Sequence, residues 1–151
     1  MPKDEWLCYT DGSCKAGDGA PGGWGYVIKP PNGPPIEGNG SAMRTLAKVM
    51  EYTAVAEALA RLPAGATATV FSDNQSLVET LEKKLPDFCA SDFRNVDPDI
   101  VETTRLISRA IAERELRITW RWLRAHNGNA GNERADELAR NGAREAKRGL
   151  R

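Results

Sequence analysis

The hydrophobic pattern of this chain changes from strand-like to helical near residue 48, and that change constrains the fold more than any other feature. Before it come three short apolar segments, at residues 6–10, 22–28 and 36–41. A glycine-rich stretch separates the first two, and the proline-rich run 30–35 separates the last two. Such segments between turn residues predict three strands of an antiparallel meander. Beyond the change, apolar residues recur at helical spacing over 48–62.

Helices and strands alternate along the rest of the chain. The expected elements are a strand at 67–72, helices at 76–84 and 99–113, a strand at 116–123 and a helix at 132–147. The order β-β-β-α-β-α-α-β-α predicts an α/β fold with a five-stranded mixed sheet, three antiparallel strands followed by parallel ones, flanked by helices on both faces. We expect a single domain of residues 1–151, with 85–97 as its one long irregular segment.

Composition excludes several protein classes. No apolar run approaches the roughly 20 residues of a membrane-spanning helix, and the start lacks an apolar signal stretch, so we expect a cytoplasmic protein without a membrane partner. Cys8, Cys14 and Cys89 have no paired spacing, which indicates reduced thiols. The formal net charge is +0, so charge alone does not indicate a nucleic-acid partner.

Two acidic residues follow predicted strands. Asp11 comes after the first strand and Asp73 after the fourth. Ligand sites in sheets of this kind gather at strand ends, and packing explains two acids there poorly. Taken singly, Asp11 could equally start a turn and Asp73 could cap the next helix.

Two predicted helices and one loop contribute further candidates. Glu51 lies in a helix that is apolar almost all round, about 120° away from the exposed Glu57, so its charge would be costly without a cation. A partly exposed place in the first turn also explains it. Asp136 falls early in the final helix, where an acid alone would complement the helix dipole. His126, the one histidine, lies in a loop rich in glycine and asparagine and by itself indicates solvated surface.

Four short motifs together resemble the signature of type 1 ribonuclease H, in the same order and over residues 6–146. They are Thr10-Asp11-Gly12-Ser13, Met50-Glu51-Tyr52, Ser72-Asp73-Asn74-Gln75, and Ala125-His126-Asn127-Gly128 leading to Asn132-Glu133-Arg134-Ala135-Asp136. The resemblance implies an endoribonuclease of the RNase H-like fold that cuts the RNA strand of an RNA–DNA hybrid.

The resemblance also implies a metal site. Asp11, Glu51, Asp73 and Asp136 would hold two Mg²⁺ ions, with Mn²⁺ as a possible substitute. One ion, between Asp11 and Asp73, would activate water. The other, held by Asp11, Glu51 and Asp136, would stabilise the leaving 3′ oxygen, giving 5′-phosphate and 3′-hydroxyl ends. His126 would assist proton transfer or product departure. The protein is expected to act as a monomer.

The resemblance places further residues against the substrate. Gly12 and Ser13 would bring backbone amides close to the strand, and Cys14, Gln75 and Glu51 would contact 2′-hydroxyl groups. Asn74 and Lys48 are also assigned to substrate binding. For Cys14 and Gln75, a loop filler and an exposed first-turn residue are equally good interpretations.

Two segments depart from the family pattern. Leu46-Ala47-Lys48 replaces a polar stretch that grips the DNA strand, and the segment from Leu85 to Phe93 lacks the basic residues of a protrusion found in some members. Basic residues elsewhere could compensate, although solvated surfaces explain them about as well: Arg117, Arg121, Arg124, Arg144, Lys147 and Arg148. The alternatives to a hybrid-cleaving enzyme are a non-catalytic hybrid-binding module and a DNA-acting nuclease of the same fold.

Overall fold

The computed structural model describes residues 4–125 and 127–149. Its elements, in chain order, are β1 (Glu5–Ser13), β2 (Ala20–Lys29), β3 (Ile36–Thr45), α1 (Ala47–Leu59), β4 (Thr67–Ser72), α2 (Gln75–Glu79), the π-helical turn η1 (Thr80–Lys84), α3 (Leu85–Ala90), the 3₁₀ turn η2 (Pro98–Ile100), α4 (Val101–Glu113), β5 (Arg117–Trp122) and α5 (Ala130–Gly149). The alternation of strands and helices after β3 is the predicted one.

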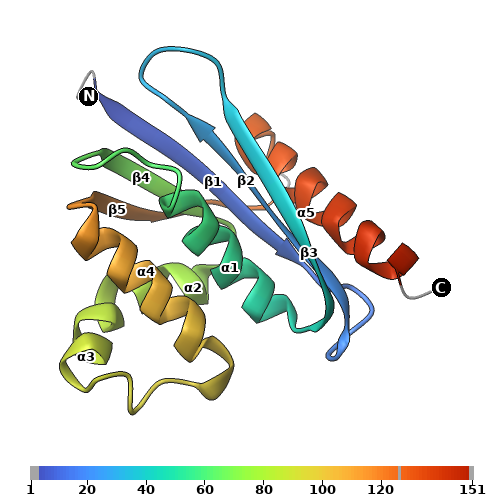
Figure 1. The fold of residues 1–151 in the computed structure, drawn as a ribbon. Coiled ribbons are helices and arrows are strands. Elements are labelled where there is room, and N and C mark those ends of the chain that lie inside the picture. Colours follow the sequence, from blue (N-terminus) through green and yellow to red (C-terminus); the bar gives the residue numbers. More distant parts are fainter. Residues whose placement is uncertain (1–3, 126, 150–151) are drawn as a thin grey trace.

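The five strands form one mixed sheet in the order β3-β2-β1-β4-β5. The first three strands pair antiparallel, and β4 and β5 add to β1 in parallel. Helices α1 and α4 lie over one face of the sheet, and α5 crosses the other (Figure 1). The predicted fold class, an α/β fold with helices on both faces, is therefore confirmed.

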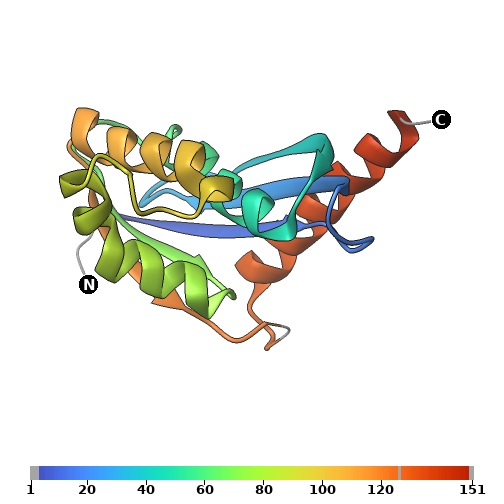
Figure 2. The ribbon, with the colours of Figure 1, turned by 90° about the horizontal axis from the view of Figure 1, so that it is seen from below.

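Each face of the sheet has its own core, because neighbouring side chains on a strand point to opposite sides. On β1, Cys8 packs into the larger core, which includes Val55 of α1 and Ile107 of α4. The next residue, Tyr9, packs into a smaller core with Leu138 of α5. Figure 2 shows the sheet edge-on between these two layers.

The segment predicted to be irregular begins with a helix. Leu85–Ala90 forms α3 and continues α2 through the π-helical turn, so the helical region is longer than the predicted 76–84. Pro86 stands in the first turn of α3, the helical position where a proline is best tolerated. Asp92 and Phe93 have positive φ angles of 54° and 60°, and the helix has ended before them.

No helix within the described parts of the chain is both long enough and apolar enough to cross a bilayer.

Candidate active site

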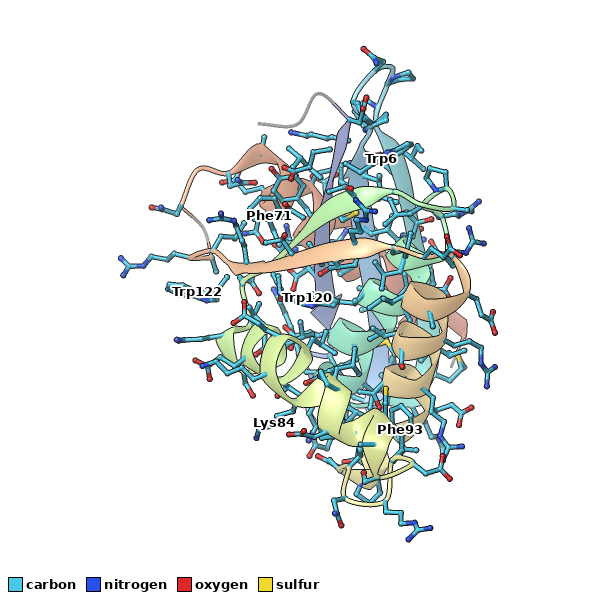
Figure 3. The ribbon with its side chains drawn as sticks, turned by 90° about the vertical axis from the view of Figure 1, so that its left-hand side faces the viewer. Trp6, Phe71, Lys84, Phe93, Trp120 and Trp122 are labelled. Atoms are coloured by element: carbon cyan, nitrogen blue, oxygen red, sulfur yellow. The ribbon has the colours of Figure 1, made fainter. Side chains whose placement is uncertain are left out.

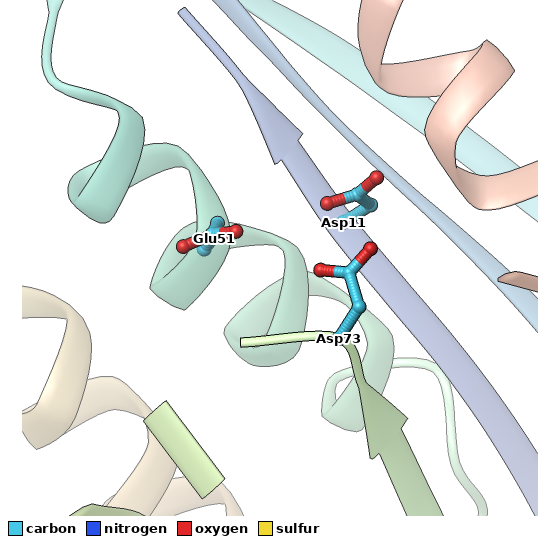
Figure 4. A group of neighbouring side chains, drawn as sticks. All are labelled: Asp11, Glu51 and Asp73. Carbon is cyan, nitrogen blue, oxygen red and sulfur yellow. The ribbon is translucent and has the colours of Figure 1, made fainter. Parts of the chain in front are cut away.

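Three carboxylates from three different elements meet at the centre of the sheet. Asp11 of β1, Glu51 of α1 and Asp73, which directly follows β4, each offer an oxygen within 4.8 Å of the other two (Figure 4). The sequence predicted that these acids would gather, although 62 positions separate Asp11 from Asp73. The convergence itself is therefore a property of the fold.

The register of the parallel pair β1–β4 brings Asp11 and Asp73 together. The last residues paired between these strands are Tyr9 and Phe71. Asp11 and Asp73 each lie two positions further along, so both stand just beyond the point where the pairing of the strands ends. The prediction that Asp73 follows its strand is confirmed. The prediction that Asp11 follows its strand is wrong, because β1 continues to Ser13 by pairing with β2.

Glu51 reaches this point because α1 crosses β1 at very close range. A Cβ atom on Gly12 would lie 2.6 Å from the carbonyl carbon of Met50 and nearer still to the amide nitrogen of Glu51. Only glycine fits there, since the neighbours are backbone atoms that cannot rotate away. The side chain of Glu51 is then held by Asn74, whose Nδ2 donates a hydrogen bond to Glu51 Oε2.

Burial and mutual repulsion disfavour the charged forms of Asp11 and Glu51. Burial, followed by the charge of Asp73, raises the pKa of Asp11 to about 8, against a hydrogen bond from the Gly12 amide that lowers it. Burial raises the pKa of Glu51 to about 7, although the hydrogen bond from Asn74 opposes the shift. A cation bound among these oxygens would offset both causes, so the group is chemically suited to a hard divalent ion.

The fourth predicted ligand, Asp136, stands beside this group on α5. Its charge contributes to the raised pKa of Asp11, although Asp136 is not among the three acids within 4.8 Å. Its Oδ2 atom lies 3.2 Å from Nε of Arg140, one helical turn further along. That distance makes an ion pair, but Nε is buried and forms no well-aligned hydrogen bond with any described residue. Asp136 is half-buried.

Comparisons with known proteins agree with this geometry. Residues 3–144 match the family model described as RNase H. The chain belongs to the RNase H family. A Ribonuclease H from Polaromonas naphthalenivorans (strain CJ2) is 38% identical over 143 residues, covering 93% of this chain and 88% of that protein. Another, from Thiobacillus denitrificans, is 35% identical over 148 residues, covering 97% of this chain and 99% of that protein.

Solved structures of other RNase H proteins share the fold. LC9-RNase H1, described as a type 1 RNase H with the type 2 active-site motif, superposes with a TM-score of 0.80 at 22% identity over 97% of this chain and 75% of that one. LC11-RNase H1, solved in complex with an RNA/DNA hybrid, superposes with a TM-score of 0.75 at 23% identity, covering 94% of this chain and 99% of that one. The predicted family and enzyme class, a ribonuclease H that hydrolyses RNA, are confirmed.

The side chains that this RNase H was predicted to turn toward substrate have varied surroundings. Gln75 is exposed, with Nε2 3.4 Å from Glu79 Oε1. Lys48 forms an ion pair with Asp97, so a phosphate would have to displace that carboxylate. His126 lies outside the described residues, and its role stays a prediction.

The predicted contacts near the end of β1 have competing partners. The amide of Gly12 donates to Asp11 Oδ1 at 2.9 Å. Ser13 is buried and pairs with Gly23 in the sheet. The Cys14 thiol is buried and points at the carbonyl oxygens of Gly17, Ala20 and Thr45, at 3.2, 3.5 and 3.6 Å. These environments favour packing roles for the side chains of Ser13 and Cys14, and the contacts of all three residues with substrate stay predictions.

The sequence did not single out Trp122, which the structure places beside the acids. Its indole Nε1 donates a hydrogen bond of 3.2 Å to the carbonyl oxygen of Asp73, and the side chain is 46% exposed (Figure 3). Trp122 is the last residue of β5 and pairs with Ser72, directly before Asp73. Its place at the end of the neighbouring parallel strand is the signal that could have found it.

Asn74 has two tasks, and substitutions can separate them. Its Oδ1 accepts from the Leu77 amide at 3.1 Å and caps α2, while its Nδ2 holds Glu51. We expect Asn74→Ser to keep a cap but to lose the bond to Glu51, raising the Mg²⁺ concentration for half-maximal cleavage about tenfold. Asn74→Ala should show the same metal effect and also lose about 1 kcal/mol of stability. A metal dependence unchanged in both variants would contradict the positioning role.

Proposed function

We propose that this RNase H hydrolyses the RNA strand of RNA–DNA hybrids with two Mg²⁺ ions held by Asp11, Glu51, Asp73 and Asp136. The observation that carries the proposal is the meeting of three carboxylates within 4.8 Å of one another, with Asp136 beside them. Oxygen ligands suit hard divalent ions, and we expect Mn²⁺ to substitute for Mg²⁺. The RNA/DNA hybrid bound to LC11-RNase H1 supports the choice of substrate.

The chain's own groups position and hold the reacting parts. The bound ions would supply activation of the attacking water and neutralisation of the leaving 3′ oxygen, which leaves 5′-phosphate and 3′-hydroxyl ends. Asp11, the acid common to both proposed ion sites, is only 7% exposed, so its surroundings exclude most water. Asn74 orients the carboxylate of Glu51, and Trp122 restrains the main chain of Asp73. Fixed positions of this kind lower the cost of organising the transition state.

A single set of cleavage assays tests this function against its alternatives. Labelled RNA–DNA hybrid, duplex DNA and duplex RNA are each incubated with the protein in Mg²⁺, in Mn²⁺ and in EDTA. We expect cleavage of the hybrid alone, only with a divalent ion, and products with 5′-phosphate ends. Cleavage of duplex DNA would favour a DNA-acting nuclease, and binding of the hybrid without any cleavage would favour a binding module.

Two other expectations accompany the proposal. We propose that residues 1–151 act as one catalytic domain and that the enzyme works as a monomer. Its cytoplasmic location stays a prediction.

A further inference from the structure

A groove outside the carboxylate site lies between the β1–β2 turn and the C-terminal half of α5. Its volume is about 470 Å³. Four cationic side chains line it, namely Lys15 on the turn and Arg140, Arg144 and Lys147 on α5, and its apolar walls include Pro21 and Ala143. No acidic residue of the described chain lines it. Both flanking segments lie at the same end of the molecule in Figure 1.

The charges of this groove are poorly neutralised. Arg140 is paired with Asp136, and Arg144 donates a hydrogen bond of 2.7 Å to the neutral side chain of Asn141. Within residues 4–125 and 127–149, Lys15 and Lys147 have no carboxylate within 4.0 Å. Since the formal net charge of the chain is +0, this cluster is a local excess rather than part of a basic surface. A local excess of positive charge attracts anions.

The groove lies next to the carboxylate site along two elements. On β1, Ser13 lines the groove only two residues after Asp11, a rise of about 7 Å. On α5, Arg140 lines it one turn after Asp136 and touches that acid. From Arg140 to Lys147 the helix rises about 10 Å, a length over which its cations can reach neighbouring phosphates of one nucleic-acid strand.

We infer that this groove binds the sugar-phosphate backbone of the cleaved strand, next to the phosphate that the carboxylates engage. The lysine and arginine side chains would contact the phosphates, and the apolar walls would pack against the sugars. The inference rests on the proposed function. It also supplies a grip on the substrate that the ion-paired Lys48 and the non-basic segment after η1 do not offer. Contacts of this kind fix the position of a strand without reading its sequence.

The double variant Arg144→Gln/Lys147→Gln tests the inference. We expect KM for the hybrid to rise about tenfold at moderate salt, with the loss falling on KM rather than kcat, because the acids are untouched. The slope of log K for hybrid binding against the logarithm of salt concentration should become shallower by about 2, since each lost phosphate contact contributes about 0.9. The matched control, Arg105→Gln/Arg109→Gln, removes two exposed arginines of α4 that lie outside the groove.

The outcomes distinguish a failure of the groove inference from a failure of the proposed function. If native protein cleaves the hybrid but the two double variants show the same KM and salt slope, the groove inference is wrong and the proposed function stands. If native protein does not cleave the hybrid, the proposed function fails, and the inference with it.

Methylphosphonates in the DNA strand identify the bound strand. The tenfold difference between native and groove variant should persist when these neutral linkages replace DNA phosphates. A difference that disappears would place the DNA strand, not the cleaved strand, in the groove.

Discussion

Asp11→Asn should lower the rate of hybrid cleavage at least about 1000-fold while leaving the fold intact, a loss of about 4 kcal/mol of transition-state stabilisation. Asp11 is the most buried of the three clustered acids and the one the proposal gives to both ions. Asparagine keeps the size of the side chain but removes its charge. Single-turnover cleavage in Mg²⁺ measures the loss, and circular dichroism checks the fold.

Asp4→Asn is the matched control for this substitution. Asp4 is exposed and directly precedes β1, so its substitution should leave cleavage within twofold of native. If Asp11→Asn retained more than a tenth of the native rate, the assignment of Asp11 to the metal site would be wrong.

The same variant should be more stable than native protein when divalent ions are absent. Folding raises the pKa of Asp11 from 3.8 to about 8, so its charged form is disfavoured in the folded state. The native protein therefore loses stability as pH rises from about 4 to about 8, and the neutral variant escapes this loss. We expect Asp11→Asn to raise the free energy of unfolding by about 2 kcal/mol at pH 8 in EDTA, and by less at pH 5. Urea unfolding at both pH values measures the difference, and equal stabilities at pH 8 would contradict it.

The sequence predicted the strands from local patterns, and it predicted the gathering of the four acids through the resemblance to type 1 ribonuclease H. Short apolar runs between turn residues mark most of the strands, and acids that bind ligands gather where parallel strands end. The extent of β1 could not be read in this way. Gly12 has low strand propensity, and β1 runs through it because β2 supplies the facing residues up to Gly23. Local propensity was overridden by tertiary pairing.

The contacts that set the site's electrostatics were also beyond sequence patterns. Asn74 was assigned to the substrate, whereas the structure joins it to Glu51 across 23 positions. The pairing of Lys48 with Asp97 spans 49 positions. Such contacts depend on the distance between packed helices, which no periodicity reports. The π-helical turn that connects α2 to α3 likewise has no signal in hydrophobic spacing.

Gly12→Ala should damage both stability and catalysis, because this glycine sets the distance between α1 and β1. The new methyl group would lie 2.6 Å from the Met50 carbonyl carbon and 2.9 Å from Glu51 Cα, and neither atom can move without the helix. We expect a loss of about 3 kcal/mol in the free energy of unfolding. Displacement of α1 also carries Glu51 away from Asp11, and a shift of about 1 Å at such a site can cost about 100-fold in rate.

Two measurements distinguish this effect from a general loss of folded protein. Cleavage is assayed at a temperature where circular dichroism shows the variant folded, across a range of Mg²⁺ concentrations. If α1 is displaced, half-maximal activity should need more Mg²⁺, because Glu51 no longer meets the other acids. Gly149→Ala is the control, since a Cβ there meets nothing nearer than 3.5 Å. Native stability and native Mg²⁺ dependence in Gly12→Ala would show that the approach of α1 to β1 does not set the geometry of the carboxylates.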